Sequence, residues 1–196
     1  MRHTEIFKKY YQEQFWGNST GCSGPNSDLK LTELLRKNIQ KLLDDYTINS
    51  MLDAGCGDAN LFRGIDISWL EYLGCDCVLE MIASNKTAFA QRNNMQFFVA
   101  DVVVDKLPQA DLILCRDVVH YLPNDLVTKM LNNFKQSNSK YLLITHNLYS
   151  NLSANSPTEI GVFRPVNLTL PPFEWPKPQE IIAEDVYGKS MAMYSL

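Results

Sequence analysis

The chain has 196 residues, of which 45% are hydrophobic and 20% are charged, and its formal net charge is -4. These values are typical of one globular domain with a sizeable core, and the absence of a broad basic field argues against a nucleic-acid partner. The N-terminus is too polar for a secretory signal and no apolar run approaches the roughly 18 residues of a membrane span, so we expect a cytoplasmic protein without a membrane partner.

Residues 1–27 form a separate N-terminal cap segment in our prediction, ahead of one domain over residues 28–196. The cap is either a helix packed on the domain or a lid that places Trp16 against a cationic ligand. The Gly- and Ser-rich stretch after Trp16 is either a flexible linker or a loop whose N–H groups bind a carboxylate. Four aromatic residues recur at helical spacing in the cap: Phe7, Tyr10, Tyr11 and Phe15.

Strand-like and helix-like stretches alternate from residue 28 to about residue 146. Apolar strands separated by helices predict a parallel sheet covered on both faces, an α/β three-layer sandwich with right-handed crossovers. The predicted helical segments are 28–46, 59–70, 79–92 and 124–137. The predicted strands are 48–54, 71–78, 95–102, 110–118 and 139–147.

The last fifty residues have a different pattern. A polar stretch over 147–161 shows little periodicity, and the proline-rich segment 171–178 predicts an extended loop. The segments 162–170 and 188–196 resemble strands. Because no helix separates these two strands, we expect them to pair antiparallel.

A glycine turn, LDAGCGDA over 52–59, follows the first predicted strand. Such a turn lies at the carboxyl end of the sheet, where α/β proteins bind ligands. The turn lacks the third glycine of a dinucleotide fingerprint, because Asn60 stands in that place. Asp53 would also repel a pyrophosphate, whereas it would attract an ammonium or a sulfonium group. The residues therefore favour a cationic cofactor.

This turn resembles the glycine motif of class I S-adenosylmethionine (SAM)-dependent methyltransferases, a pattern of acid-x-G-x-G-x-G. Asp53, Gly55 and Gly57 match that motif, and Ala59 replaces its third glycine. The resemblance extends over nearly the whole chain, including the segments FRPVNL and KSMAMYSL. It implies a Rossmann-like fold with a mostly parallel seven-stranded sheet in the order 3-2-1-4-5-7-6, the seventh strand antiparallel.

The resemblance also assigns cofactor contacts to the ends of later strands. Asp76, followed by Cys77, matches the acid that binds both ribose hydroxyls, for which two carboxylate oxygens are well suited. Asp101 matches the acid that accepts a hydrogen bond from the adenine amino group, with the backbone of Val102 beside it. Arg116 would contribute mainly its backbone.

Two residues after the fourth strand are candidates for catalysis. Methyl transfer needs the acceptor to be aligned and, where necessary, deprotonated. His120 is a candidate general base, or else a loop residue that hydrogen-bonds backbone. Asp117 is a second candidate, or else a cap of the following turn. Arg164 either binds an anionic acceptor or forms a surface salt bridge.

We therefore predict a SAM-dependent methyltransferase that acts on an O or N atom of a small-molecule acceptor and yields S-adenosylhomocysteine (SAH). The alternatives are a non-catalytic SAM-binding module and a nicotinamide-dependent oxidoreductase; Asp53 and Asn60 speak against the latter. The five cysteines match neither a CxxC nor a zinc pattern, so we expect reduced thiols and no metal site.

Overall fold

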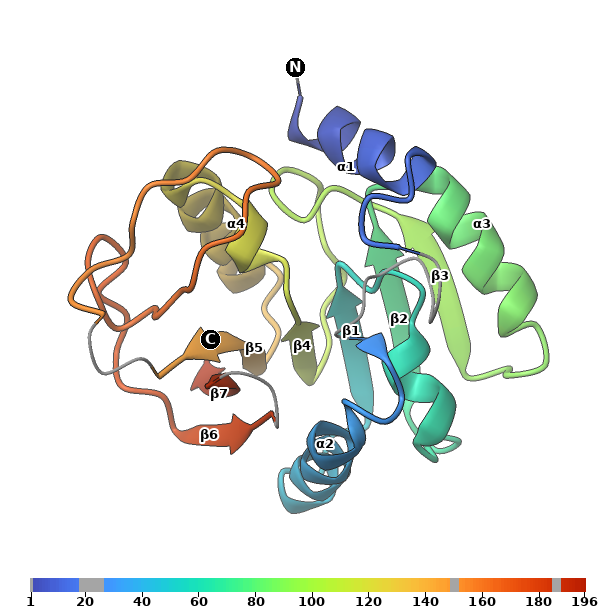
Figure 1. The fold of residues 1–196 in the computed structure, drawn as a ribbon. Coiled ribbons are helices and arrows are strands. Elements are labelled where there is room, and N and C mark those ends of the chain that lie inside the picture. Colours follow the sequence, from blue (N-terminus) through green and yellow to red (C-terminus); the bar gives the residue numbers. More distant parts are fainter. Residues whose placement is uncertain (1, 18–26, 149–151, 185–187) are drawn as a thin grey trace.

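Seven strands form one sheet in the computed structural model, which describes residues 2–17, 27–148, 152–184 and 188–196 (Figure 1). Their order is β3-β2-β1-β4-β5-β7-β6, in which β7 is antiparallel to both neighbours and all other pairs are parallel. The predicted Rossmann-like sheet is therefore confirmed. The strands are β1 (Ser50–Ala54), β2 (Glu71–Asp76), β3 (Met95–Val99), β4 (Leu112–Cys115), β5 (Tyr141–Asn147), β6 (Glu180–Ala183) and β7 (Lys189–Ser195).

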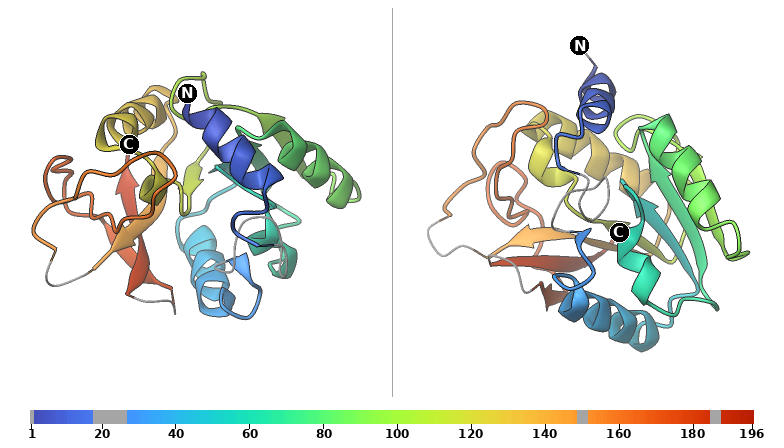
Figure 2. Two further views of the ribbon diagram at one scale, coloured as in Figure 1. Left: turned by 45° about the horizontal axis from the view of Figure 1, so that its top comes forward. Right: turned by 45° about the vertical axis from the view of Figure 1, so that its right-hand side comes forward.

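Helices cover both faces of this sheet (Figure 2). Successive residues of β4 show the two faces, because Leu112 belongs to one hydrophobic cluster and Ile113 to the other. Helix α2 contributes Ile39 to the first cluster, and α4 contributes Phe134 to the second. The α-helices are α1 (His3–Gln12), α2 (Glu33–Asp45), α3 (Leu79–Ala88) and α4 (Asn124–Gln136), and the 3-10 helices are η2 (Asn60–Gly64) and η3 (Val119–Tyr121).

The sixth strand is not the segment that the sequence predicted. Residues 162–170 contain no strand, and β6 lies at Glu180–Ala183 instead. Pro165 lacks an N–H for a sheet ladder, and the N–H groups on either side of it bond elsewhere. The N–H of Arg164 donates to His120 O (3.0 Å), and the N–H of Val166 donates to Asn147 Oδ1 (2.9 Å).

The carboxyl ends of β1, β2, β3 and β4 meet at one edge of the sheet, and α1 lies over this edge beside α3 (Figure 1). An ion pair between Lys8 and Glu80 (3.2 Å) joins the two helices. This arrangement positions residues from the cap segment next to the strand ends. In the described part of the chain, no helix has the length and apolar character that a membrane crossing requires.

Candidate active site

A cavity of about 210 Å³ lies at the carboxyl ends of the parallel strands, under α1. A single water molecule in the liquid occupies roughly 30 Å³, so this space is large enough for a ligand. All nine residues predicted to contact the cofactor line the cavity: Trp16, Asp53, Gly55, Gly57, Asp76, Cys77, Asp101, Val102 and Arg116. Their individual contacts with a ligand stay predictions.

The glycine turn lies close against neighbouring elements. The N–H groups of Gly55 and Cys56 both donate to Cys75 O (2.9 Å each), which joins the turn to the end of β2. Gly55 has φ +83°, and a Cβ there would lie 2.3 Å from Val118 Cγ2. Only glycine combines this conformation with this space. Ala59, in place of the third glycine, also has a positive φ of 50°, so the backbone keeps the conformation that glycine favours.

Asn60, which stands at the position of the third glycine in a dinucleotide fingerprint, forms two hydrogen bonds beside the turn. Its side-chain amide donates to Ser27 O (3.0 Å), and its N–H donates to Asp58 Oδ1 (3.1 Å). Ser27, Asp58 and Asn60 all line the cavity. The side chain of Asn60 therefore connects two segments that line the cavity, at a position where that fingerprint has a glycine without a side chain.

Asp53 is buried at the end of β1, where the Tyr72 hydroxyl donates a hydrogen bond to its Oδ2 (2.7 Å). Burial raises the pKa of Asp53 to about 7, although the bond from Tyr72 opposes this shift. The carboxyl is thus balanced between its neutral and ionised forms near neutral pH. A positively charged ligand beside it would favour the ionised form.

The other two predicted acids accept backbone hydrogen bonds at the ends of β2 and β3. Asp76 accepts from the N–H groups of Gly57 (3.2 Å) and Val78 (3.0 Å), and burial raises its pKa. Asp101 accepts from the N–H of Val103 (3.0 Å), and its Oδ2 lies 2.8 Å from His3 Nε2. These bonds fix the orientation of both carboxylates at the cavity.

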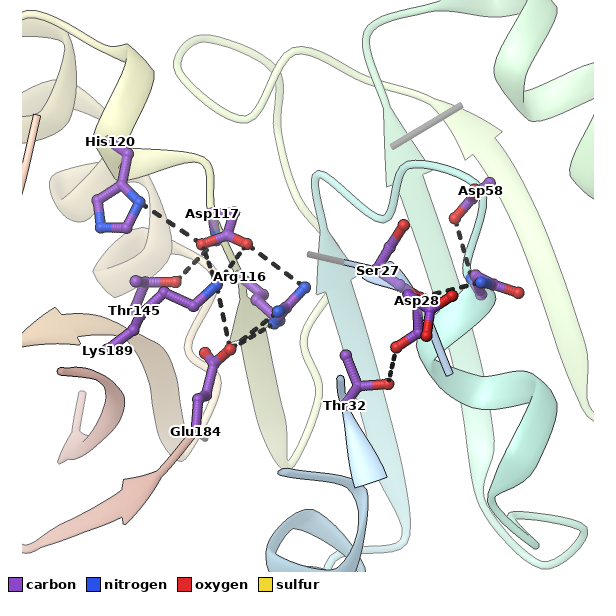
Figure 3. A network of polar contacts seen from close by, with 11 residues as sticks. Ser27, Asp28, Thr32, Asp58, Arg116, Asp117, His120, Thr145, Glu184 and Lys189 are labelled. Atoms are coloured by element: carbon purple, nitrogen blue, oxygen red, sulfur yellow. Dashed lines mark hydrogen bonds and ion pairs between the residues drawn. The ribbon is translucent and has the colours of Figure 1, made fainter. Parts of the chain in front are cut away.

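A buried cluster of charged side chains holds Arg116 and Asp117 in place (Figure 3). Arg116 Nη2 donates to Glu184 Oε2 (2.8 Å), and Lys189 Nζ lies 3.1 Å from the same oxygen. Lys189 Nζ also donates to both carboxylate oxygens of Asp117, at 2.9 and 2.7 Å. Glu184 directly follows β6 and Lys189 begins β7, so the C-terminal strand pair supports the cavity wall.

Asp117 lines the cavity, but its charge is already compensated. Burial favours its neutral form, yet Arg116 and Lys189 outweigh burial and hold the pKa of Asp117 below its usual value. Its backbone has φ +61° and its N–H donates to Thr145 Oγ1 (2.7 Å). A carboxylate so stabilised is a weak base, and the geometry favours an anchoring role.

His120, the candidate general base, is not among the residues that line the cavity. It is buried, its Nε2 shares a hydrogen bond with Asn147 Oδ1 (2.8 Å), and its Nδ1 lies 3.5 Å from Asp117 Oδ1. The ring packs on Phe163, with centroids 4.8 Å apart, and burial lowers its pKa. The geometry therefore favours the alternative of a hydrogen-bonding loop residue.

Aromatic residues of the cap cover the cavity. Phe7, Tyr11 and Trp16 line it from the N-terminal segment, and Tyr121 lines it from η3. The rings of Trp16 and Tyr121 meet edge to face, with centroids 5.7 Å apart. The predicted carboxylate-binding loop after Trp16 falls on residues 18–26, outside the described residues.

Several lining residues were missed from the sequence. Cys56 and Asp58 lie inside the glycine turn, and Tyr121 follows the fourth strand, so each neighbours a predicted residue. His3 carried no signal at all. Among the described residues, no group of three or more His, Cys, Asp or Glu side chains is placed to hold a metal ion.

Comparison with known proteins finds similarity to methyltransferases. Residues 52–138 match a protein-family model described as a methyltransferase domain, and no curated protein matches the sequence. Magnesium protoporphyrin IX methyltransferase (ChlM) from Synechocystis PCC 6803, solved with bound SAM, has a TM-score of 0.66 and 11% identity over 100% of this chain and 97% of that one.

Two further solved structures are similar. Human N-acetylserotonin methyltransferase in complex with SAM has a TM-score of 0.70 and 14% identity, covering 98% of this chain and 59% of that one. Haemonchus contortus phosphoethanolamine N-methyltransferase 1 has a TM-score of 0.61 and 18% identity, covering 81% and 35%. At these identities the likeness shows the fold.

Proposed function

We propose that this chain, a methyltransferase of the class I fold that uses SAM, transfers a methyl group to an O or N atom of a small-molecule acceptor. One observation carries the proposal: Asp53, Asp76 and Asp101, from the ends of three adjacent strands, line the same cavity. The acidic lining suits a cation and disfavours polyanionic partners such as nucleic acid.

The residues of the cavity fit SAM by their chemistry. Gly55 and Gly57 line the cavity from the turn after β1, so a ligand can approach the backbone of this turn. Asp76 would hold the two ribose hydroxyls and Asp101 the adenine amino group. Asp53 and the ring of Trp16 would face positive charge. When bound, SAM supplies a methyl group on a cationic sulfur.

The remaining work of the site is alignment of the acceptor. Polar groups whose orientation is already fixed need no reorganisation during the reaction. Backbone N–H groups fix the orientation of Asp76. Lys189 fixes the orientation of Asp117. Among the described lining residues, His3 is the one histidine, and its ring nitrogen already lies against Asp101. We therefore propose that the chain acts mainly by positioning.

A second function, SAM binding without turnover, is favoured by the positions of the two predicted proton acceptors. Asp117 is neutralised by Lys189 and Arg116, and His120 is outside the cavity. An acceptor that needs no proton removal would still react. Transfer of label from methyl-labelled SAM to any small molecule separates the two functions.

Calorimetric titration tests the proposal directly. We expect SAM and SAH to bind and NAD not to bind. Asp76→Ala should weaken SAM binding by about 1 to 3 kcal/mol, because charge-assisted hydrogen bonds are lost. Asp66→Ala is the matched control, since that exposed carboxylate also accepts a backbone N–H, from Ser68 (3.0 Å), away from the cavity. Binding of NAD without binding of SAM would overturn the proposal.

A further inference from the structure

Arg164 is buried without a counter-ion. Its side chain belongs to a residue that is only 4% exposed, and it forms no ion pair with any described residue. The surface salt bridge that the sequence left open for Arg164 is therefore absent from the described residues. The guanidinium group needs another explanation.

Most of its hydrogen-bonding capacity is unused. Nη2 donates to Leu122 O (3.1 Å), and the Cζ atom lies 5.8 Å from the centroid of the Phe173 ring. Nε and Nη1 are fully covered and have no hydrogen-bond partner. Burial lowers the pKa of Arg164, which reflects a charge that its surroundings do not compensate.

Arg116 shows how this protein compensates a largely covered guanidinium with anionic side chains. That side chain has Glu184 at 2.8 Å and Asp117 at 3.4 Å. A buried charge without such partners is costly to the fold. The missing partner of Arg164 has the chemistry of an anion that accepts two hydrogen bonds, a geometry that matches carboxylate and phosphate groups.

The unpaired guanidinium lies directly behind the wall of the cavity. Leu122, whose carbonyl accepts its one hydrogen bond, lines the cavity, as does Tyr121. Gly161 N–H donates to Tyr121 O (2.8 Å), so the segment 161–164 runs along η3. The three acids that we expect to contact the cofactor follow β1, β2 and β3. The Arg164 side chain instead bonds to Leu122, which follows β4, so the guanidinium group lies apart from these acids.

We propose that Arg164 binds a carboxylate or phosphate group of the methyl acceptor. This inference rests on the proposed function, because it names the substrate class of the same site. Residues 152–179 contain no helix or strand, and Phe173 of this irregular segment lies against the covered guanidinium. An anion would reach Nε and Nη1 by displacing part of that cover, and the neighbouring Phe163 is exposed.

Calorimetric titration of the SAH-saturated protein with benzoate, inorganic phosphate and neutral benzamide tests the inference. We expect benzoate or phosphate to bind and benzamide to bind at least tenfold more weakly, and the better anion identifies the group. Arg164→Met should reduce anion affinity about 10- to 100-fold, as expected for charge-assisted hydrogen bonds. If neither benzoate nor phosphate binds the wild-type protein more tightly than benzamide does, the inference is overturned without any variant.

Arg63→Met is the matched control, because Arg63 also lies over a phenylalanine, Phe89, at 5.0 Å but is exposed and outside the cavity. It should leave anion affinity unchanged, and an equal loss in both variants would contradict the assignment. Thermal unfolding adds a second readout. Arg164→Met should unfold at the same or a higher temperature, because a hydrophobic replacement removes an unpaired buried charge, and a large decrease would show a structural role instead.

A labelling experiment distinguishes this inference from the proposed function. The protein is incubated with methyl-labelled SAM and a small-molecule extract, and the labelled products are separated on an anion exchanger. Label in retained, anionic products supports both. Label only in neutral or cationic products overturns the anion site while the methyltransferase activity stands. Absence of label from every fraction contradicts the proposed activity, and the benzoate and phosphate titrations then decide on Arg164 alone.

Discussion

At the scale of single residues, burial controls the charge of the acids at the cavity. Asp53 and Asp117 lie at the ends of adjacent strands and have opposite pKa shifts. Asp53 has a hydroxyl for its partner, whereas Asp117 has the cations Lys189 and Arg116. The difference makes Asp53 the acid that responds to pH near neutrality.

We expect the preference for SAM over SAH to decrease as the pH falls through about 7. SAM carries the additional positive charge, so it binds better to ionised Asp53, whose pKa is about 7 without ligand. Each pH unit below that value reduces the ratio of the two affinities by up to about tenfold. Titrating groups that affect both ligands equally cancel in this ratio. Calorimetry at several pH values measures the ratio.

Asp53→Asn is the control for this effect, because its SAM-to-SAH affinity ratio should not change with pH. A wild-type ratio that is constant from pH 6 to 8 would contradict the assignment. The raised pKa of Asp53 also determines the direction in which the stability of the fold changes with pH. Since the folded pKa of Asp53 exceeds its usual value near 3.8, protonation stabilises the fold below pH 4, and this contribution is lost as the pH rises through 7.

His120→Ala should reduce the free energy of unfolding by about 1 to 3 kcal/mol, because it removes a buried hydrogen bond and leaves a cavity. The lost contacts are those with Asn147 Oδ1 and the ring of Phe163. We expect SAM affinity to stay within about twofold of wild type. Chemical denaturation and calorimetry measure both quantities, and unchanged stability would contradict the structural role of His120.

At the scale of secondary-structure elements, the close approach of the turn after β1 to Val118 determines which residues the turn accepts. Gly55→Ala should reduce stability by about 2 to 4 kcal/mol, the sum of a strained positive φ and overpacking against Val118. Gly17→Ala separates the two causes. Gly17 has nearly the same φ, +82°, but nothing within 4 Å of an added Cβ, so only the smaller, conformational cost should remain.

Denaturant unfolding of both variants measures this difference. Equal losses in Gly55→Ala and Gly17→Ala would mean that Val118 moves away without cost. SAM affinity should also decrease in Gly55→Ala, because the turn that lines the cavity would shift. In Gly17→Ala the cavity lining is unchanged.

At the scale of the whole molecule, the N-terminal residues His3, Phe7, Tyr11 and Trp16 form part of the cavity lining together with the strand ends. Helix α1 contacts the rest of the chain through the Lys8–Glu80 ion pair and the His3–Asp101 contact, and Trp16, which follows the helix, adds a ring pair with Tyr121. None of the described residues of α1 is fully buried. Such a helix is held by few contacts and is a candidate for ligand-dependent closure.

Limited proteolysis tests whether residues 1–27 act as a lid. Addition of SAM should slow cleavage within residues 1–27 several-fold, because a ligand in the cavity adds contacts to Phe7, Tyr11 and Trp16. NAD, which we expect not to bind, serves as the control ligand. Equal cleavage with and without SAM would favour a helix that is simply packed on the domain.

The sequence by itself determined the features that depend on local patterns. Alternation of apolar strands with helices predicted the sheet, and Asp53, Asp76 and Asp101 each end one strand. Parallel strands bring their carboxyl ends to one edge, so these acids had to lie near one another. The sixth strand was missed because Glu180–Ala183 has only four residues, which is too short for a periodicity.

Only the tertiary structure decided the contacts between segments far apart in the chain. Arg116 meets Glu184 across 68 residues, and Asp117 meets Lys189 across 72, although both partners resemble surface charges in the sequence. The same packing turns His120 away from the cavity and buries Arg164 without an anion. The direction of a side chain and the compensation of its charge depend on which elements pack together in space. A local sequence pattern contains no information about these long-range contacts.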